Sequence, residues 1–301
     1  MFILGHLSDI HLAPLPRPAV HELMSKRAIG YITWRRRRLK HRREVLDRLV
    51  DDLLAQGPDH IAMTGDLVNI ALPEEFRVVR RWLDKTGGPE MITVIPGNHD
   101  AYVPFLRNPG IRHWEPYMLA NDAGMTFGDL RRHAFPFVRL FGDIALLCLS
   151  SARATMPGMA SGRLGRGQML RAAALLERLG GQGYCRVVLI HHPPLPGMTD
   201  WHRALHDARA FRTVLSDHGA ELVIHGHNHR VMLTRLEGKS GVIPIIGAPS
   251  ASVASTEPSN RAGYNLFSID GGGKAPWRIS MKSRSFDPDG RPDEINQDLL
   301  P

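Results

Sequence analysis

The first hundred residues alternate between short apolar runs and amphipathic stretches. Apolar runs with the length of buried strands lie at 1–6, 59–63 and 91–95. Between the first two, apolar residues recur every three or four positions over 45–54, which predicts a helix that ends at Gly57-Pro58. A second helix is expected at 74–83. This order of strand, helix, strand, helix and strand is typical of a parallel sheet.

The rest of the chain predicts further strands and two more helices. FPFVRLF and IALLCLS, on either side of Gly142-Asp143, predict a β-hairpin, and helices are expected at 168–179 and 205–218. The strands CRVVLI and ELVIH come next, and VMLTRLE, GVIPIIGA, YNLFSID and WRISMKS predict a mostly antiparallel sheet. Residues 101–134 predict loops and short helices. We expect one domain over 1–285 and a loose tail at 286–301.

The composition is that of an ordinary globular protein. The chain has 301 residues, of which 43% are hydrophobic and 23% charged, and a chain of this size needs no disulfides for stability. Cys148 and Cys185 sit in apolar runs and are expected to be buried, reduced thiols. The N-terminus MFILGHLSDIHL lacks the features of a signal peptide, and no run reaches the ~18 apolar residues of a spanning helix. We expect a cytoplasmic protein.

The positive charge of the chain is concentrated in one block. TWRRRRLKHRR carries seven positive charges between Arg35 and Arg43, and without them the formal net charge falls from +8 to +1. Such a distribution indicates a local binding patch for a polyanion or an anionic surface instead of a generally basic nucleic-acid-binding protein.

Every apolar strand of the α/β part ends in residues that can bind a metal. The clusters are Asp9-Ile10-His11, Gly65-Asp66, Gly97-Asn98-His99-Asp100, His191-His192 and Gly226-His227-Asn228-His229. Each cluster by itself is common in proteins with no site. Because sites in open parallel sheets form just outside the carboxyl ends of the strands, five such clusters together predict one shared site.

The residue types in these clusters predict two metal ions. Imidazole suits first-row transition metals, and carboxylate and amide oxygens suit harder ions. No cysteine is available as a ligand, which argues against a structural zinc site. The candidate ligands exceed what one ion needs, so two divalent ions that share a carboxylate, ~3.5–4 Å apart, are the economical arrangement. Mn, Fe and Zn all suit these ligands.

The motifs DxH, GD, GNHD, HHP and GHxH follow one another here in an order that closely resembles the calcineurin-like metallophosphoesterase family, over roughly residues 1–250. The resemblance implies an α/β fold, a four-layer α/β/β/α sandwich of two mixed sheets. It also implies the metal ligands. One ion would be bound by Asp9, His11 and His229, the other by Asn98, His191 and His227, and Asp66 would bridge the two.

The resemblance also implies the reaction. A hydroxide that bridges the two metals would attack the phosphorus of a phosphodiester, with no covalent phospho-enzyme. His99 would face the scissile phosphate and protonate the leaving oxygen, and Asp100 would orient His99. His192 is expected near the substrate or behind the metal ligands. Trp114, Tyr117 and His113 are further candidates for lining the substrate cleft.

The substrate is less determined than the reaction. GNHD and the segment SGRLGRGQMLRAAALLERL resemble the bacterial phosphodiesterase branch related to cyclic-nucleotide phosphodiesterases, which implies a small soluble diester. The departure from that branch is a basic insert at about 13–43. Its aromatic and cationic residues over 20–43 suit peripheral contact with the inner face of the membrane, with Arg35 and Arg36 as candidate substrate contacts.

Three alternatives follow from this insert. The resemblance extends to bacterial hydrolases of lipid-linked pyrophosphates such as UDP-diacylglucosamine, which would make the insert a lid at a membrane surface. The insert is equally compatible with a solvated helix face that binds nothing. A nuclease ranks lowest, because the chain shows no aromatic stacking platform, and we expect no nucleic-acid partner. The oligomeric state is open.

Overall fold

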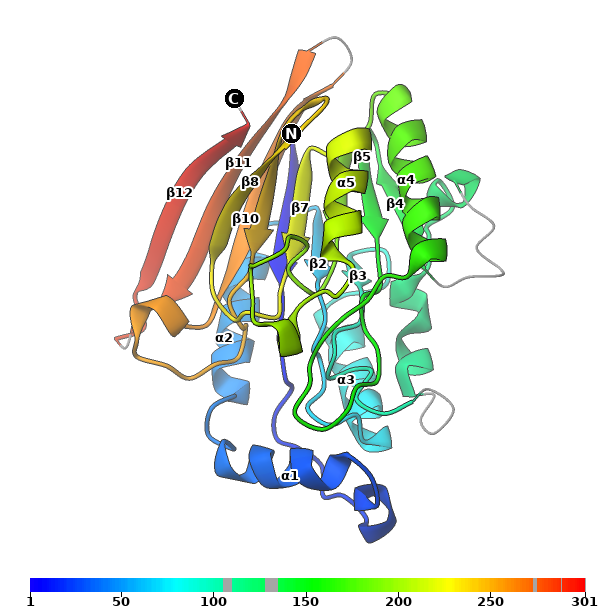
Figure 1. The fold of residues 1–301 in the computed structure, drawn as a ribbon. Helices are drawn as coiled ribbons and strands as arrows, with labels where there is room; N and C mark the ends of the chain where they lie inside the picture. The colour runs from blue at the N-terminus through cyan, green and yellow to red at the C-terminus, as the bar shows by residue number, and fades with distance from the viewer. Residues whose placement is uncertain (105–109, 128–134, 273–274, 288, 301) are drawn as a thin grey trace.

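Two six-stranded sheets face each other in the computed structural model (Figure 1), which describes residues 1–301 except 105–109, 128–134, 273–274, 288 and 301. The first sheet has the order β12 (Pro292–Leu300), β11 (Ala275–Phe286), β10 (Gly263–Gly272), β1 (Phe2–Leu7), β2 (His60–Met63) and β3 (Ile92–Val94). Within it, β1, β2 and β3 are parallel, and β10 pairs with β1 antiparallel. The expected parallel arrangement of the first three strands is confirmed.

The second sheet has the order β4 (Phe137–Phe141), β5 (Ile144–Cys148), β6 (Cys185–Leu189), β7 (Leu222–His225), β9 (Gly241–Gly247) and β8 (Met232–Gly238). The strands β5, β6, β7 and β9 are parallel. At its two edges β4 and β8 run antiparallel to β5 and β9. The hairpin predicted around Gly142-Asp143 is therefore present.

Four helices cover the outer faces of the sheets. On the first sheet these are α2 (Arg43–Ala55) and α3 (Pro73–Thr86), and on the second they are α4 (Arg166–Gly181) and α5 (Ala208–His218). The strands of the second sheet are apolar on both faces. In β6, Val187 and Leu189 join the core between the sheets, while Val188 joins the core under α4 and α5. This is the four-layer α/β/β/α sandwich that the sequence predicted.

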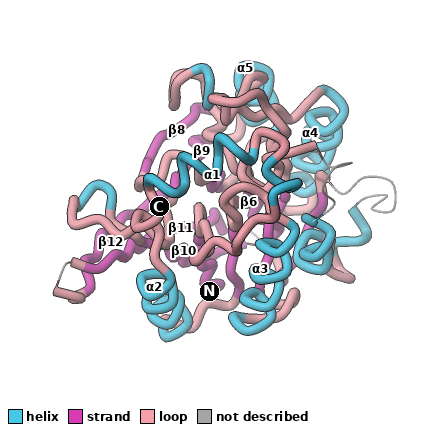
Figure 2. The backbone as a smooth tube through the Cα atoms, turned by 90° about the horizontal axis from the view of Figure 1, so that it is seen from below, coloured by secondary structure: helices cyan, strands magenta, loops and turns pink. Residues whose placement is uncertain are grey.

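The segment before α2 lies at the end of the molecule where β1 ends. It contains η1 (Val20–Leu23) and α1 (Arg27–Arg36), and Figure 2 shows α1 crossing the middle of that end, beneath the strands. Short 3-10 helices lie in other connections, at η3 (Gly110–Met118), η4 (Gly124–Phe127), η5 (Trp201–Arg203) and η6 (Pro258–Asn260). No helix among the described residues is long and apolar enough to cross a membrane.

Two expectations for the second half of the chain are wrong. The late strands do not form one sheet, because β8 and β9 join the second sheet and β10 and β11 join the first. The tail at 286–301 is not loose over its main part, since β12 pairs with β11 from Ile279 to Phe286. An edge strand needs backbone partners but no apolar face. The sequence of β12 is mostly polar and therefore shows no strand pattern, although its Leu299 is buried.

Candidate metal centre

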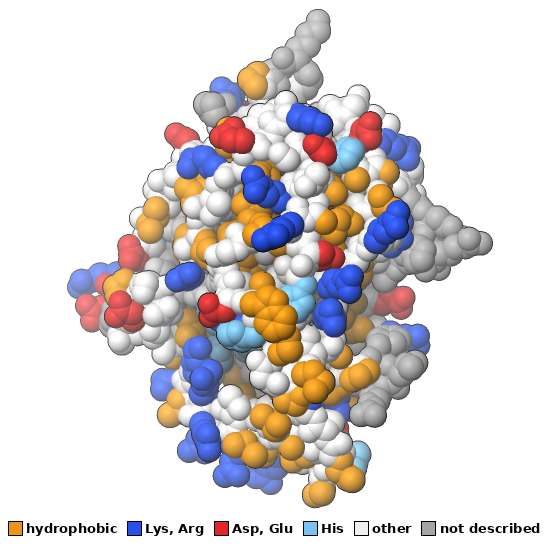
Figure 3. Space-filling view, in the orientation of Figure 1, with side chains coloured by type: hydrophobic (Ala, Val, Ile, Leu, Met, Phe, Trp, Pro, Cys, Tyr) orange, Lys and Arg blue, Asp and Glu red, His pale blue; other side chains and the backbone are white. Residues whose placement is uncertain are grey.

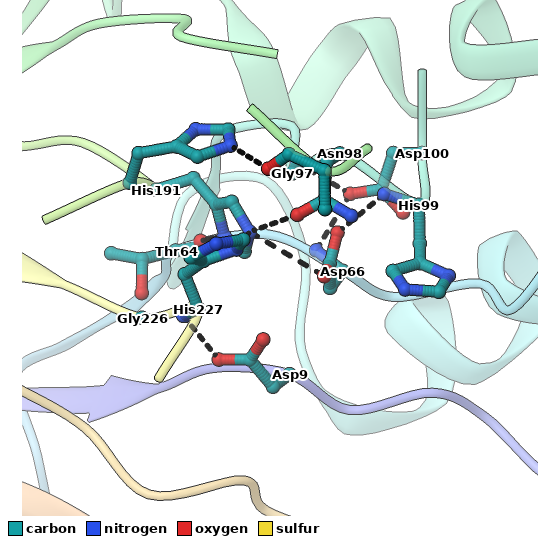
Figure 4. Close-up of polar contacts among 12 residues, drawn as sticks. Asp9, Thr64, Asp66, Gly97, Asn98, His99, Asp100, His191, Gly226 and His227 are labelled. Carbon is teal, nitrogen blue, oxygen red and sulfur yellow. Dashed lines mark hydrogen bonds and ion pairs between the residues drawn. The ribbon is translucent and has the colours of Figure 1, made fainter. Parts of the chain in front are cut away.

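The polar clusters that follow five strands meet at one place. Strands β1, β2 and β3 of the first sheet and β6 and β7 of the second all end there, and the loops after them carry the side chains shown in Figure 4. The structure thereby brings together all seven of the predicted ligands, six of which are buried. The six are Asp9, His11, Asp66, Asn98, His191 and His227, and His229 is part-buried.

Asp9, His11 and His229 form the first group of side chains. The His229 Nε2 lies 3.1 Å from the Asp9 Oδ1, and the rings of His11 and His229 have centroids 5.4 Å apart. His11 is oriented by a hydrogen bond of 3.1 Å between its Nδ1 and the carbonyl of Val68. The second ring nitrogen of His11 is thus left for the site.

Asn98, His191 and His227 form the second group. The Nε2 of His191 lies 3.1 Å from the Asn98 Oδ1 and 3.3 Å from the Nδ1 of His227. The Nδ1 of His191 makes a hydrogen bond of 2.6 Å to the carbonyl of Thr64. Two of these three residues come from the second sheet, so each sheet contributes to the centre.

Asp66 lies between the two groups. Its Oδ2 is 3.4 Å from the Nε2 of His191. Asp66 belongs to two groups of possible ligand atoms, and within each group the atoms all lie within 4.8 Å of one another. One group contains Asp9 and His191, and the other contains His11 and His99. One carboxylate that reaches both groups is the arrangement that a bridging ligand requires.

The backbone is strained at the candidate ligands. Six non-glycine residues of the described chain have a positive φ, and five of them are predicted ligands: Asp9 (52°), His11 (41°), Asp66 (57°), His227 (71°) and His229 (56°). The left-handed region is uncommon for residues with a side chain and costs about 1–3 kcal/mol at each position. Strain gathered at these residues indicates that the loops are shaped for the site.

Two motif glycines allow the ligand loops to pack against one another. A Cβ at Gly97 would overlap the Asp66 carboxylate and its backbone nitrogen, and a Cβ at Gly226 would overlap the Ser8 hydroxyl and the Asp9 carboxylate. Glycine is therefore required by close approach in GNHD and GHxH, which places the loops after β1, β2, β3 and β7 side by side.

The electrostatics of the centre suit bound cations. Burial opposes ionisation of Asp9 and Asp66, but His229 beside Asp9 and His191 beside Asp66 hold both carboxyl pKa values below their ordinary range. Despite its burial, the pKa of His191 is raised to about 9, chiefly by Asp66. The Nε2 of His227 is buried without a hydrogen-bond partner. Clustered carboxylates with an unpaired imidazole nitrogen are the donor set of a transition-metal site.

His99 is part-buried at the edge of this centre. Its backbone N–H donates to the Asp66 Oδ1 at 2.7 Å, and its Nδ1 bonds the carbonyl of Asn69. Its ring packs edge-on to His11, with centroids 4.8 Å apart, and stacks on Tyr102 at 5.8 Å. The Asn69 carbonyl is the group that orients His99. Because it is a backbone group, no residue type in the sequence could have indicated this role.

Asp100 does not orient His99, contrary to the prediction. Its carboxylate is buried and accepts four backbone hydrogen bonds from the loops that carry the ligands. The donors are Asp66 (2.8 Å), Leu67 (2.9 Å), Val68 (3.1 Å) and Gly97 (2.8 Å). Burial and the nearby Asp66 raise the pKa of Asp100 to about 7, against the hydrogen bonds of Gly97 and Val68. The role of Asp100 is to tie the two loops together.

His192 lies behind the candidate metal ligands, which is one of the two positions expected for it. His192 is fully buried, and its Nδ1 and Nε2 are hydrogen-bonded to the Ser151 hydroxyl at 2.8 Å and the Ala160 carbonyl at 3.0 Å. It therefore supports His227, whose ring centroid is 4.5 Å away, instead of meeting a substrate. Arg35 and Arg36 are exposed at the end of α1.

His41 is a residue of the centre that the sequence analysis missed. It belongs to the basic block, yet its ring lies 4.6 Å from the ring of His11 and 5.9 Å from that of His229, centroid to centroid. Burial, followed by His11 and His229, lowers the pKa of His41. A histidine inside a run of arginines gives no motif, and it is distant in sequence from most of the candidate ligands.

One cavity has a volume of about 450 Å³, and its lining contains neither His99 nor any of the candidate ligands. Its lining includes Tyr102, which stacks on His99, together with Lys26, Arg153 and mainly apolar neighbours. The other lining residues are Ser25, Val103, Pro104, Ala154, Thr155, Met156, Met159, Ser161 and His206. Trp114 and Tyr117, predicted to line the cleft, are instead buried in the core, and His113 is exposed outside this lining.

Comparisons with known proteins give matches over most of the chain. The model of the family described as calcineurin-like phosphoesterase matches residues 3–231. A probable cyclic nucleotide phosphodiesterase of Synechococcus sp. is 27% identical over 235 residues, which are 76% of this chain and 78% of the relative. The glycerophosphodiester phosphodiesterase GpdQ of Enterobacter lignolyticus is 28% identical over 193 residues, 60% of each chain.

Solved structures show the same fold. A dimetal phosphatase from Danio rerio superposes with a TM-score of 0.61 at 15% identity and covers 98% of both chains. The purple acid phosphatase PPD1 from yellow lupin superposes with a TM-score of 0.52 at 11% identity, over 98% of this chain and 53% of its own.

Proposed function

Because the chain belongs to the calcineurin-like phosphoesterase family, and is therefore a metal-dependent phosphoester hydrolase, we propose that it hydrolyses a phosphodiester at a dinuclear metal centre. The observation that carries this proposal is the position of Asp66 between two groups of nitrogen and oxygen ligands. The proposed ligands are Asp9, His11 and His229 for one ion, Asn98, His191 and His227 for the other, and Asp66 for both.

The proposed ions, the ligand loops and His99 have separate roles in the reaction. Two divalent cations would lower the pKa of a bound water and neutralise charge on the phosphoryl oxygens. The strained, tightly packed ligand loops hold the seven donors in place before the substrate arrives. Since the Asn69 carbonyl accepts from the Nδ1 of His99, the Nε2 is the nitrogen that would donate a proton to the leaving oxygen.

A small diester is the substrate class that the observations favour. Two relatives are named as phosphodiesterases, one probably of cyclic nucleotides and one of glycerophosphodiesters. The cavity lined by Tyr102 offers apolar walls together with Lys26 and Arg153, which suit the organic part of an ester and a further anionic group.

Replacing Asp66 tests the proposal. Protein stripped with a chelator and reloaded with Mn²⁺ should bind two ions and hydrolyse bis-p-nitrophenyl phosphate. Asp66→Asn keeps the shape of the side chain and should lose both metal affinity and hydrolysis, while Asp122→Asn, at an exposed position, should retain both. The proposal fails if Asp66→Asn binds two ions with wild-type affinity, or if the loaded wild type hydrolyses no diester.

A specific surface supports a second candidate, the hydrolysis of a lipid-linked phosphodiester or pyrophosphate at an anionic membrane. Residues 20–39 expose the apolar side chains of Val20, Met24, Ile29, Ile32 and Leu39, all more than half exposed, next to Arg35–Arg38. Figure 3 shows hydrophobic and basic side chains side by side over the part of the molecule where α1 lies. Such a mixture suits an interfacial helix.

The arginines of α1 separate the two candidates. Each basic residue near an anionic surface contributes about 1 kcal/mol, so Arg35→Gln with Arg36→Gln should weaken vesicle binding about thirtyfold without slowing hydrolysis of a soluble diester. Arg209→Gln with Arg212→Gln, at two exposed arginines of α5, is the matched control. Equal vesicle binding by both double variants, or none by the wild type, would reject the membrane candidate.

A further inference from the structure

The basic block brings a histidine to the metal centre that no motif of the chain accounts for. His11, His41 and His229 each offer a ring nitrogen, and the three nitrogens lie within 4.8 Å of one another. His11 and His229 belong to the proposed first metal group. His41 is therefore placed where a further ligand to that ion would stand.

The position of His41 is fixed by backbone pairing. The Arg42 N–H donates to the Ser252 carbonyl at 2.9 Å, and the Ala254 N–H donates to the Lys40 carbonyl at 2.7 Å. These bonds form an antiparallel bridge between His41 and Val253. The segment after α1 is thus attached to the loop that follows β9, beside the centre.

The side chain of His41 is held as the other site histidines are. Its Nδ1 forms a hydrogen bond of 2.8 Å with the hydroxyl of Ser252, which is buried. The Nδ1 atoms of His11 and His191 are likewise bonded, to backbone carbonyls. A metal-binding histidine usually donates its other ring N–H in this way, which fixes the ring and leaves one nitrogen for the ion. In His41 that nitrogen is the Nε2.

We propose that His41 is a further ligand of the ion held by Asp9, His11 and His229, and that it ties the basic segment to the metal centre. This inference rests on the proposed dinuclear site. Asp9, His11, Asp66 and His229 supply four donors, and an additional imidazole gives a ligand set that suits Mn, Fe or Co. The exposed arginines before His41 would then be held in a fixed position when the metal is bound.

Cobalt binding distinguishes a ligand from a packing residue. His41→Phe keeps an aromatic ring against His11 and His229 but removes both nitrogens, and His41→Gln removes the ring. Apo protein of each variant is titrated with Co²⁺ while visible absorption and bound metal are recorded. His21→Phe, at an exposed histidine of the same segment, serves as the control. Far-UV circular dichroism establishes that each variant is folded.

Both His41 variants should bind one of the two cobalt ions at least about tenfold more weakly. Loss of a residue that merely supports a metal ligand already has an effect of this size. The d–d absorption of that ion should also change. Ser252→Ala should weaken the same ion by less. Cobalt affinity and spectra equal to wild type in both His41 variants would overturn the ligand role. Wild type that binds fewer than two ions would instead contradict the proposed function, so the two failures are distinguishable.

Discussion

Replacing Asp100 by asparagine should loosen the loops that carry the proposed metal ligands. The Oδ1 of Asp100 accepts the N–H groups of Leu67 and Val68, and its Oδ2 accepts those of Asp66 and Gly97. The amide of asparagine has one oxygen, so it satisfies one of these pairs. The other pair of N–H groups then faces an NH₂ group that cannot accept.

The size of the effect follows from that count. A buried donor left without a partner costs about 1–3 kcal/mol, so two of them lower the free energy of unfolding by about 2–6 kcal/mol. Asp207 provides a matched comparison away from the centre. Its two oxygens accept one N–H each, from Leu164 at 3.1 Å and Gly165 at 2.8 Å. Asp207→Asn leaves one donor without a partner, and because these bonds are only part-buried it should cost at most about 1–3 kcal/mol.

Urea unfolding followed by tryptophan fluorescence, with a chelator present, measures these differences without a contribution from bound metal. Metal analysis after reloading with Mn²⁺ gives the second readout. Asp100→Asn should be the less stable variant and should bind metal more weakly, because Asp66 lies on the loosened loop. If Asp100→Asn is no less stable than Asp207→Asn and binds two ions as wild type does, the assigned role of Asp100 is wrong.

Three further outcomes are expected. His99→Ala should keep both ions but lower kcat toward a diester with a poor leaving group by roughly 10²–10⁴, and unchanged turnover in steady-state kinetics would exclude His99 as the acid. Gly226→Ala would push a Cβ into the Ser8 hydroxyl and the Asp9 carboxylate, so calorimetry should show weakened metal binding; wild-type affinity would contradict the close packing. Burial opposes ionisation of Asp52, but hydrogen bonds from Arg284 and Tyr264 keep its pKa below the ordinary value. Because the pKa is lower in the folded state, the ionised carboxyl stabilises the fold above its unfolded pKa of about 4, and this stabilisation is lost as pH falls through the folded pKa. Thermal melts from pH 3 to 7 should therefore show that Asp52→Asn costs less stability at pH 3 than at pH 7, and an equal loss at both would refute this.

The sequence predicted a shared site because chain direction constrains where the polar clusters lie, and the resemblance to the family implied which residues would be the ligands. Parallel strands end at the same edge, so polar clusters after apolar runs had to converge. The glycines beside Asp66, Asn98 and His227 marked the tight loops that the structure contains. The four layers of the fold were implied by the resemblance, and they are consistent with apolar strands and interspersed amphipathic helices, which need cover on both faces.

Other features depend on contacts that local pattern does not carry. His41 reaches the centre by pairing with Val253, far away in sequence, and an arginine-rich stretch hides that pairing. Asp100 follows His99 directly, which suggested that it orients that ring, yet its carboxylate faces backbone N–H groups. The polar strand β12 is held by backbone bonds at an edge, where side-chain alternation is not required.

The most direct test of a dinuclear phosphodiesterase is the rate of bis-p-nitrophenyl phosphate hydrolysis as Mn²⁺ is added to apo protein at a concentration well above the dissociation constant. The arrangement of two ligand groups around Asp66 predicts a rate that rises until two Mn²⁺ are bound per chain and then stays constant. A rate that reaches its plateau at one Mn²⁺ per chain, or two bound ions with no hydrolysis, would contradict it.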